Sequence, residues 1–292
     1  MTKFDIKETV TNSIIKAIEE GTAPWRSPWT GSQTGVAFPL RSTGEQYRGI
    51  NILLLWCAAQ KNNYVSAHWF TYKQAADLGA QVRKGEKSST VVKYGTFDKE
   101  NEQGEEAKIP YTKAYRVFNA DQIDGLPDQF YIQPDPPRDL GTIADGELDL
   151  FFGCVGVPID TTKEPRAFYS LTTDRIHMPP IATFYEAADY YGVLAHESAH
   201  ATGHKNRLDR FKKFQNRKAY AFEELIAEIA SSILGAEMGF RPDFGQSASY
   251  VEGWLKALND DKSMIFRAAS EAQKAVDYIK AAADTAQNEE AA

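Results

Sequence analysis

The sequence predicts an α+β protein of two domains. Its 292 residues are enough for two ordinary domains, each with its own hydrophobic core. Apolar residues recur at helical spacing near both ends of the chain, whereas the later part of the first half contains short valine-rich, strand-like segments. A stretch rich in proline follows that region. We therefore expect domains over 1–125 and 143–285, a linker over 126–142 and a frayed tail over 286–292.

In the first half, the pattern predicts helices followed by a strand pair. Helices are expected over 5–21, over a segment that ends at Ala59 and over Tyr72–Leu78, with a loop rich in Trp, Pro, Gly and Ser between the first two. Thr90–Tyr94 and Tyr111–Phe118 are predicted to be strands that pair around a polar, acidic loop.

The second half is predicted to be mainly helical. Strands near 167–178 end at a Pro-Pro pair. Helices are expected near 143–152, over Phe184–His204, from Ala219 onward, and over 247–282.

His196-Glu197-Ser198-Ala199-His200 is an H-E-x-x-H motif in a chain that has only five histidines. Residues i and i+4 of a helix share one face, so both imidazoles can bind one metal ion while Glu197, about 100° further round, reaches a water on that metal. The apolar residues before the motif argue against an exposed, charged helix face. The motif therefore indicates a zinc hydrolase site.

Such a site takes a third protein ligand. His204 is on the same helix face, but it is about 12 Å along the axis from His196, too far for ligands that each lie about 2 Å from one ion. The metzincin pattern places a histidine where this chain has Asn206. Both alternatives are therefore disfavoured.

The helix that begins near Ala219 offers carboxylates instead. Glu224 and Glu228 are four residues apart on a stripe of small residues, which lets the helix approach a neighbour closely. In a glutamate zincin, one such glutamate binds the metal and an acid one turn later holds a ligating histidine by its other ring nitrogen. We assign these roles to Glu224 and Glu228 respectively. The reverse assignment stays open, as does an exposed acidic helix with no metal role.

Charge divides unevenly along the chain, whose net charge is -7. Residues 1–125 hold 16 Lys and Arg against 14 Asp and Glu, whereas residues 126–292 hold 17 against 26. Between Arg26 and Lys93 there are nine basic residues and three acidic ones. A positive region of this kind attracts phosphates.

Aromatic residues alternate with these basic residues, and they include Tyr72 beside Lys73 and Tyr94 beside Lys93. Unpaired bases stack on exposed aromatic rings while cations contact the backbone, so the mixture favours single-stranded over duplex nucleic acid. The alternative for each ring alone is a core residue beside a solvated neighbour. The candidate DNA contacts are Trp25, Arg26, Trp29, Tyr47, Arg48, Asn51, Trp69, Lys73, Gln74, Arg83, Lys84 and Lys87.

Several motifs together resemble the antirestriction protein ArdC family of conjugative plasmids and other mobile elements. In the second half these are H-E-S-A-H-A-T-G-H and A-F-E-E-L-I-A-E. In the first half they are P-W-R-S-P-W at 24–29, Y-R-G-I-N at 47–51, W-F-T-Y-K-Q-A at 69–75 and V-R-K-G-E-K at 82–87. The resemblance covers nearly the whole chain. It implies an N-terminal α+β domain that binds single-stranded DNA, a C-terminal zincin-like metallopeptidase domain, and protection of incoming plasmid DNA from host restriction.

A peptidase mechanism follows from these assignments. His196, His200 and Glu224 would hold Zn²⁺, or another divalent ion such as Mn²⁺ or Co²⁺, and Glu197 would take a proton from the metal-bound water and pass it to the leaving amine. An edge strand over Tyr169–Met178 is placed to bind an extended peptide. Candidates for stabilising the oxyanion are His177, Tyr220 and Tyr250.

The expected partners are single-stranded DNA and an unidentified protein, such as a host restriction or defence factor. Two distant cysteines, no signal peptide and no 18-residue apolar run predict a cytoplasmic protein without a membrane partner. The resemblance to a family of conjugative plasmids implies that the protein could also reach the recipient cell during conjugation. Two functions remain open at this point. The chain is either a metallopeptidase brought to its target by DNA binding, or a DNA-binding protector whose metal site is structural or inactive.

Overall fold

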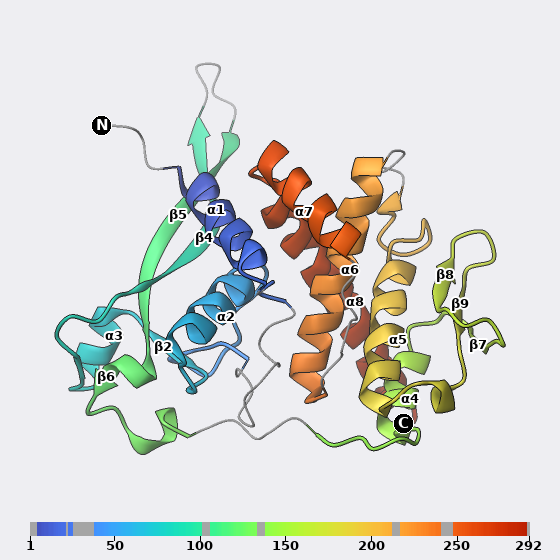
Figure 1. Ribbon diagram of the computed structural model, residues 1–292. Coiled ribbons are helices and arrows are strands. Elements are labelled where there is room, and N and C mark those ends of the chain that lie inside the picture. Colours follow the sequence, from blue (N-terminus) through green and yellow to red (C-terminus); the bar gives the residue numbers. More distant parts are fainter. Residues whose placement is uncertain are drawn as a thin grey trace.

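A computed structural model describes the chain over residues 5–21, 23–25, 38–100, 106–132, 138–211, 217–240 and 248–290. The fold is α+β, as the sequence predicts. In Figure 1 the elements of the first half lie on the left. The helix that carries the H-E-x-x-H motif, α5 (Ala187–Thr202), and a small sheet lie on the right, and the C-terminal helices lie between them.

In its described residues, the first half combines three α-helices with a four-stranded sheet in the order β1-β2-β5-β4 and a two-stranded sheet of β3 and β6. Its helices are α1 (Ile6–Glu19), α2 (Ile50–Asn62) and α3 (Tyr72–Asp77). Its strands are β1 (Leu40–Arg41), β2 (His68–Phe70), β3 (Gln81–Val82), β4 (Ser89–Glu100), β5 (Glu106–Asn119) and β6 (Ile123–Asp124).

The predicted strand pair is present as the antiparallel hairpin of β4 and β5. Its register runs from Ser89 opposite Val117 to Glu100 opposite Glu106. Both strands are longer than predicted, because backbone pairing in a hairpin continues beyond the valine-rich segments that identify it in the sequence.

The described part of the second half contains five α-helices and a three-stranded sheet in the order β7-β9-β8. The helices are α4 (Gly146–Gly153), α5 (Ala187–Thr202), α6 (Arg217–Met238), α7 (Ala248–Asp260) and α8 (Met264–Glu290), and the strands are β7 (Ile159–Thr161), β8 (Phe168–Ser170) and β9 (Arg175–Met178). The predicted edge strand over Tyr169–Met178 needs correction. Within that range only β8 lies at an edge of the sheet, because β9 is the central strand and pairs with β7 on one side and with β8 on the other.

One large hydrophobic core includes residues of both halves. Trp25 is fully buried and packs edge-to-face on Trp254 of α7, with ring centroids 5.6 Å apart. The side chain of Gln273 in α8 accepts a hydrogen bond from the Gly49 backbone N–H at 3.0 Å. The expectation of a separate main core in each half is therefore wrong, because the apolar faces of α7 and α8 pack against α1 and α2 (Figure 1).

A smaller core lies within the first half and extends past residue 125. Leu126 and Phe130 are buried in it together with Phe70. The first residues of the predicted linker thus belong to the fold of the first half. At the other end of the chain, α8 continues to Glu290, into the segment expected to be frayed. Among the described helices, none is both long enough and apolar enough to cross a membrane.

Candidate metal centre and nucleic-acid surface

The candidate metal centre lies where α5 packs along α6. Helix α5 begins at Ala187, three residues later than predicted, because Phe184 has extended backbone, and it ends at Thr202. Ala195 and Ala199 of α5 are fully buried, and α6 is the element against which α5 packs most extensively. This close approach of the two helices brings side chains of α6 next to the H-E-x-x-H motif.

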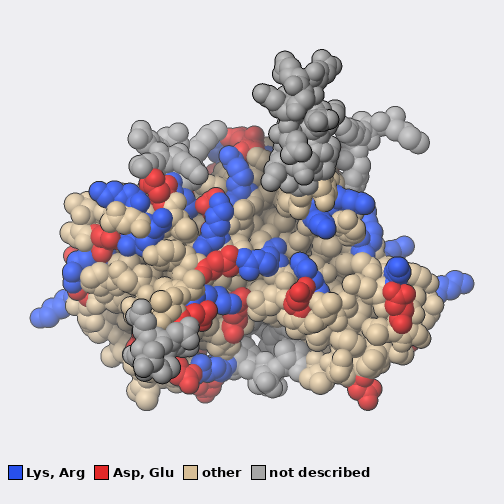
Figure 2. Space-filling model, turned by 180° about the vertical axis from the view of Figure 1, so that it is seen from behind, with Lys and Arg blue, Asp and Glu red and all other residues tan. Residues whose placement is uncertain are grey.

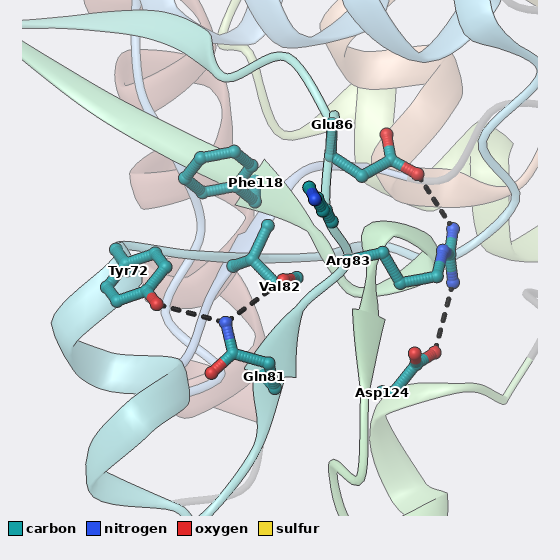
Figure 3. Close-up of a pocket in the computed structure, with 8 residues that line it drawn as sticks. Tyr72, Gln81, Val82, Arg83, Glu86, Phe118 and Asp124 are labelled. Atoms are coloured by element: carbon teal, nitrogen blue, oxygen red, sulfur yellow. Dashed lines mark hydrogen bonds and ion pairs between the residues drawn. The ribbon is translucent and has the colours of Figure 1, made fainter.

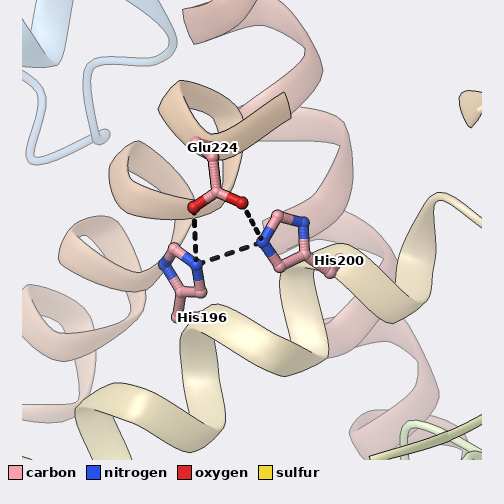
Figure 4. A group of neighbouring side chains, drawn as sticks. All are labelled: His196, His200 and Glu224. Atoms are coloured by element: carbon pink, nitrogen blue, oxygen red, sulfur yellow. Dashed lines mark hydrogen bonds and ion pairs between the residues drawn. The ribbon is translucent and has the colours of Figure 1, made fainter. Parts of the chain in front are cut away.

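Two histidines of α5 and one glutamate of α6 converge at this contact (Figure 4). The Nε2 atoms of His196 and His200 are 3.1 Å apart, and each lies 3.5 Å from one carboxylate oxygen of Glu224. One ligand atom from each residue lies within 4.8 Å of the other two. Two imidazoles and one carboxylate, converging and largely buried, form a donor set that fits zinc and similar divalent ions.

Glu197 lies beside this group and is 8% exposed. One oxygen of its carboxylate accepts a hydrogen bond from the backbone N–H of Tyr169 in β8, at 2.7 Å. The predicted general base, Glu197, therefore contacts the edge strand that is predicted to bind the peptide substrate.

Glu223 holds the other ring nitrogen of His200. Its Oε1 lies 3.2 Å from His200 Nδ1. The same carboxylate accepts hydrogen bonds from Arg210, from Nε at 2.9 Å and from Nη2 at 2.6 Å, and Arg210 is only 1% exposed. Arg210 also donates to the backbone oxygen of Ala199 at 2.8 Å. A chain of contacts thus runs from a buried guanidinium through Glu223 to a candidate ligand.

The sequence analysis missed Glu223. It selected Glu224 and Glu228 because they share a helix face, whereas Glu223 is about 100° away from Glu224 on α6. Arg210, between the two motif helices in the sequence, is the one available signal, but only the structure shows that it is buried and therefore takes a carboxylate partner. Glu228 is one turn beyond Glu224 and is buried. Its assigned role remains a prediction.

The acidic groups shift the protonation of this centre. Burial by itself lowers the pKa of His200, but the hydrogen bonds to Glu223 and Glu224 and the charge of Glu197 outweigh it and raise that pKa to about 10. Burial favours the neutral forms of Glu223 and Glu224, yet their contacts with Arg210 and the histidines hold both pKa values below the ordinary value. Without metal, His200 therefore carries a proton at neutral pH, which a metal ion must displace.

His204 lies beyond the end of α5, 3.6 Å from Asp174, and is not among the three converging donors. Of the candidates for oxyanion stabilisation, His177 stacks on Phe168 within the small sheet and Tyr220 is 59% exposed on α6. The side chain of Tyr250 lies outside the described residues. Their role stays a prediction.

The predicted DNA-binding rings require a correction. Trp25, Tyr47 and Trp69 are 0%, 8% and 2% exposed. They are core residues: Trp25 packs on Trp254 of α7, Trp69 packs on Tyr64, and the guanidinium of Arg41 lies over the ring of Tyr47. Arg26 and Trp29 lie outside the described residues.

Several of the polar candidates have structural partners. Asn51 binds both backbone groups of Val92, with its amide donating at 2.9 Å and its oxygen accepting at 2.7 Å. Gln74 forms the capping box of α3. Arg48 pairs with Asp277 of α8. The exposed candidates without an ion pair to a described residue are Lys73, Lys84 and Lys87.

The surface charge is mixed on the face that Figure 2 shows. Basic side chains alternate there with acidic ones and do not form one continuous patch. On this face, DNA binding would therefore depend on individual cations and rings more than on a broad positive field.

Comparison with known proteins identifies the two halves. Residues 4–118 match the model of the N-terminal domain of the anti-restriction factor ArdC, and residues 146–271 match a zincin-like metallopeptidase model. A crystal structure of metal-free antirestriction protein ArdC from plasmid R388 is 59% identical, with a TM-score of 0.88 over 97% of this chain and 99% of that one. This chain belongs to the ArdC antirestriction family.

A Mn(II)-bound crystal structure of the same ArdC protein is 58% identical, with a TM-score of 0.83 over 96% of this chain and 98% of that one. Together with the zincin-like domain, it supports a divalent metal in this ArdC family member.

Two further relatives show where this ArdC family architecture occurs. Uncharacterized protein y4eC of Sinorhizobium fredii is 36% identical, over 99% of this chain and 96% of its own length. DNA primase TraC of Escherichia coli is 39% identical over 96% of this chain, but the chain spans only 27% of that relative's length.

Proposed function

We propose that this ArdC family member binds single-stranded DNA and hydrolyses a peptide bond in a protein target, and thereby protects incoming DNA from host restriction. The target would be a host restriction or defence factor in the cytoplasm, of either the donor or the recipient cell. The observation that supports this most is the convergence of His196, His200 and Glu224 beside Glu197. Zn²⁺ is the metal we expect, with Mn²⁺ or Co²⁺ able to replace it.

Each residue of the centre has a separate task in this proposal. His196, His200 and Glu224 would hold the metal, which lowers the pKa of a bound water and polarises a carbonyl oxygen. Glu197 would accept a proton at its carboxylate and then donate it to the leaving amine. The Tyr169 N–H fixes the orientation of that carboxylate. The outer edge of β8 would pair with an extended peptide.

The alternative is a DNA-binding protector whose metal is structural or inactive. A structural zinc site contributes directly to folding, so removal of the metal unfolds small domains that depend on it. The ArdC protein from plasmid R388 has been crystallised without metal, and this chain matches that structure at a TM-score of 0.88. A relative that has this fold without metal argues against a metal that is needed for folding.

Glu197→Gln separates the two functions. Because Glu197 is not a ligand in this proposal, the variant should keep the metal, the thermal stability and the affinity for DNA, and should lose peptide hydrolysis. Glu186→Gln, at an exposed position just before α5, is the matched control. If Glu197→Gln protects entering DNA as well as the parent does, peptide hydrolysis is not the basis of protection and the DNA-binding protector takes its place.

A further inference from the structure

A pocket in the first half lies well away from the metal centre. It has a volume of about 550 Å³ and is lined by residues of α3, β3, β5 and β6 and of the turn after β3. Figure 3 shows Tyr72, Gln81 and Phe118 on one side of it. We call it the α3 pocket. Its volume falls within the range of about 300–1,000 Å³ that is typical of sites for small ligands.

The α3 pocket presents an exposed ring whose orientation is fixed. The side chain of Tyr72 lines the pocket and is 54% exposed. Its hydroxyl accepts a hydrogen bond from Gln81 Nε2 at 2.9 Å, and the same nitrogen donates to the backbone oxygen of Val82 at 3.1 Å. An aromatic ring that is both exposed and held in place loses little entropy when a base stacks on it.

The opposite wall of the pocket is formed by Arg83 and the two acidic residues with which it pairs (Figure 3). Arg83 donates to Glu86 at 3.1 Å and to Asp124 at 3.3 Å, and it also binds the backbone oxygen of Asp121. Its guanidinium is therefore occupied by protein acceptors. Arg83 shapes the wall and is not the group that would bind a phosphate.

Lys84 supplies the remaining positive charge. It lines the pocket, is exposed and forms no ion pair with the part of the chain that the structure describes. The two basic residues of the lining are balanced by two acidic ones, Glu86 and Asp124. A pocket without net charge does not attract a polyphosphate, but it accommodates a neutral base with one phosphate at the lysine.

We propose that the α3 pocket binds one base of single-stranded DNA, which stacks on Tyr72 while Lys84 pairs with the adjacent phosphate. This inference rests on the DNA binding proposed above and assigns it a location. It also replaces the buried rings Trp25, Tyr47 and Trp69 with an exposed one as the stacking surface.

The test uses the full-length protein and a short, fluorescein-labelled oligothymidylate, with affinities measured by fluorescence anisotropy at several salt concentrations. Loss of one base–aromatic stack should make Tyr72→Ala bind roughly 5- to 160-fold more weakly. Its slope of log affinity against log salt should equal that of the parent, because no charge is removed. Tyr72→Phe, which keeps the ring but loses the hydroxyl that accepts from Gln81, should retain most of the affinity. Tyr185→Ala, which removes a tyrosine that is 95% exposed in the second half, is the matched control and should bind as the parent does.

Lys84→Gln should give the complementary result. Removal of one phosphate contact should weaken binding and make the salt slope shallower by about 0.7. Lys163→Gln, at an exposed position between β7 and β8, should leave the slope unchanged. Unchanged melting temperatures would show that all the variants are folded.

Three results would overturn the proposal, each in a distinct way. If Tyr72→Ala binds the oligonucleotide as tightly as the parent, DNA binding stands but the α3 pocket is not its base site. If the parent itself does not bind the oligonucleotide, the DNA-binding function fails as well. If thymidine monophosphate competes as effectively as the oligonucleotide at equal nucleotide concentration, the pocket is a site for free nucleotides.

Discussion

Replacement of Glu223 by Gln tests the contacts behind His200. Glu223 and Arg210 form a pair with side chains 6% and 1% exposed, so solvent does not screen their interaction appreciably. Removing one member of a buried pair leaves the other charge uncompensated and costs about 3–5 kcal/mol. We therefore expect Glu223→Gln to lower the free energy of unfolding by about that amount.

The same substitution should weaken metal binding. Partners that hold a ligating histidine by its other ring nitrogen contribute about 10- to 100-fold to metal affinity. Glu223 is the residue that contacts Nδ1 of His200, at 3.2 Å. Titration against a chelator of known affinity measures this loss, under conditions in which the variant is folded.

Urea denaturation of the metal-free protein measures the stability change. Glu271→Gln is the control, because its pair with Lys274 lies at the surface, with side chains 20% and 55% exposed, and should contribute less than about 1 kcal/mol. Arg210→Met combined with Glu223→Leu should recover much of the loss, since no buried charge is then left unpaired. If Glu223→Gln unfolds at the same urea concentration as the parent and binds metal equally well, the reasoning about this contact chain is refuted.

Three further predictions follow from the same structure. Below the His200 pKa of about 10, metal affinity should rise with pH by up to about tenfold per unit, because the metal displaces a proton from His200. Calorimetry measures this affinity, and equal affinities at neutral and mildly alkaline pH would contradict the prediction. His200→Ala and Glu224→Ala should each lose most of the bound metal in elemental analysis, whereas Glu228→Ala should bind metal about 10- to 100-fold more weakly. If Glu228→Ala loses the metal and Glu224→Ala keeps it, the roles of the two glutamates are exchanged. Trp25→Ala should lower the free energy of unfolding by about 3–5 kcal/mol, because its ring is fully buried against Trp254, and a denaturation midpoint equal to that of the parent would show that the shared core is not important for stability.

The local elements of the fold could be predicted from sequence because their signals are local. Helical spacing located α1, α3 and the C-terminal pair, and valine-rich segments located the β4–β5 hairpin. The domain boundary was less accessible. The proline-rich stretch indicated a linker, yet Leu126 and Phe130 pack inward, since burial depends on distant partners such as Phe70 that no local pattern identifies.

The nucleic-acid surface shows the same limit. In the sequence, an aromatic residue next to lysine or arginine looks the same whether its ring is exposed or buried in the core. Trp25 and Trp69 are buried and Tyr72 is exposed, and only the packing of α7 and of the sheet distinguishes them. The sequence therefore indicated a class of partner for this half, and the tertiary structure changed which ring is available to it.

At the candidate metal centre, the sequence alone determined the motif helix and the two histidines that share its face. Helical periodicity requires His196 and His200 to share a face, and the same periodicity places Glu224 and Glu228 together on the second helix. The tertiary structure decided how the two helices meet. Because α5 and α6 pack against each other, Glu224 lies within 3.5 Å of both imidazoles and Glu223 lies between His200 and the buried Arg210. Contacts between elements distant in sequence depend on side-chain volume and burial across the whole core, and the spacing of residues within one helix carries no information about them.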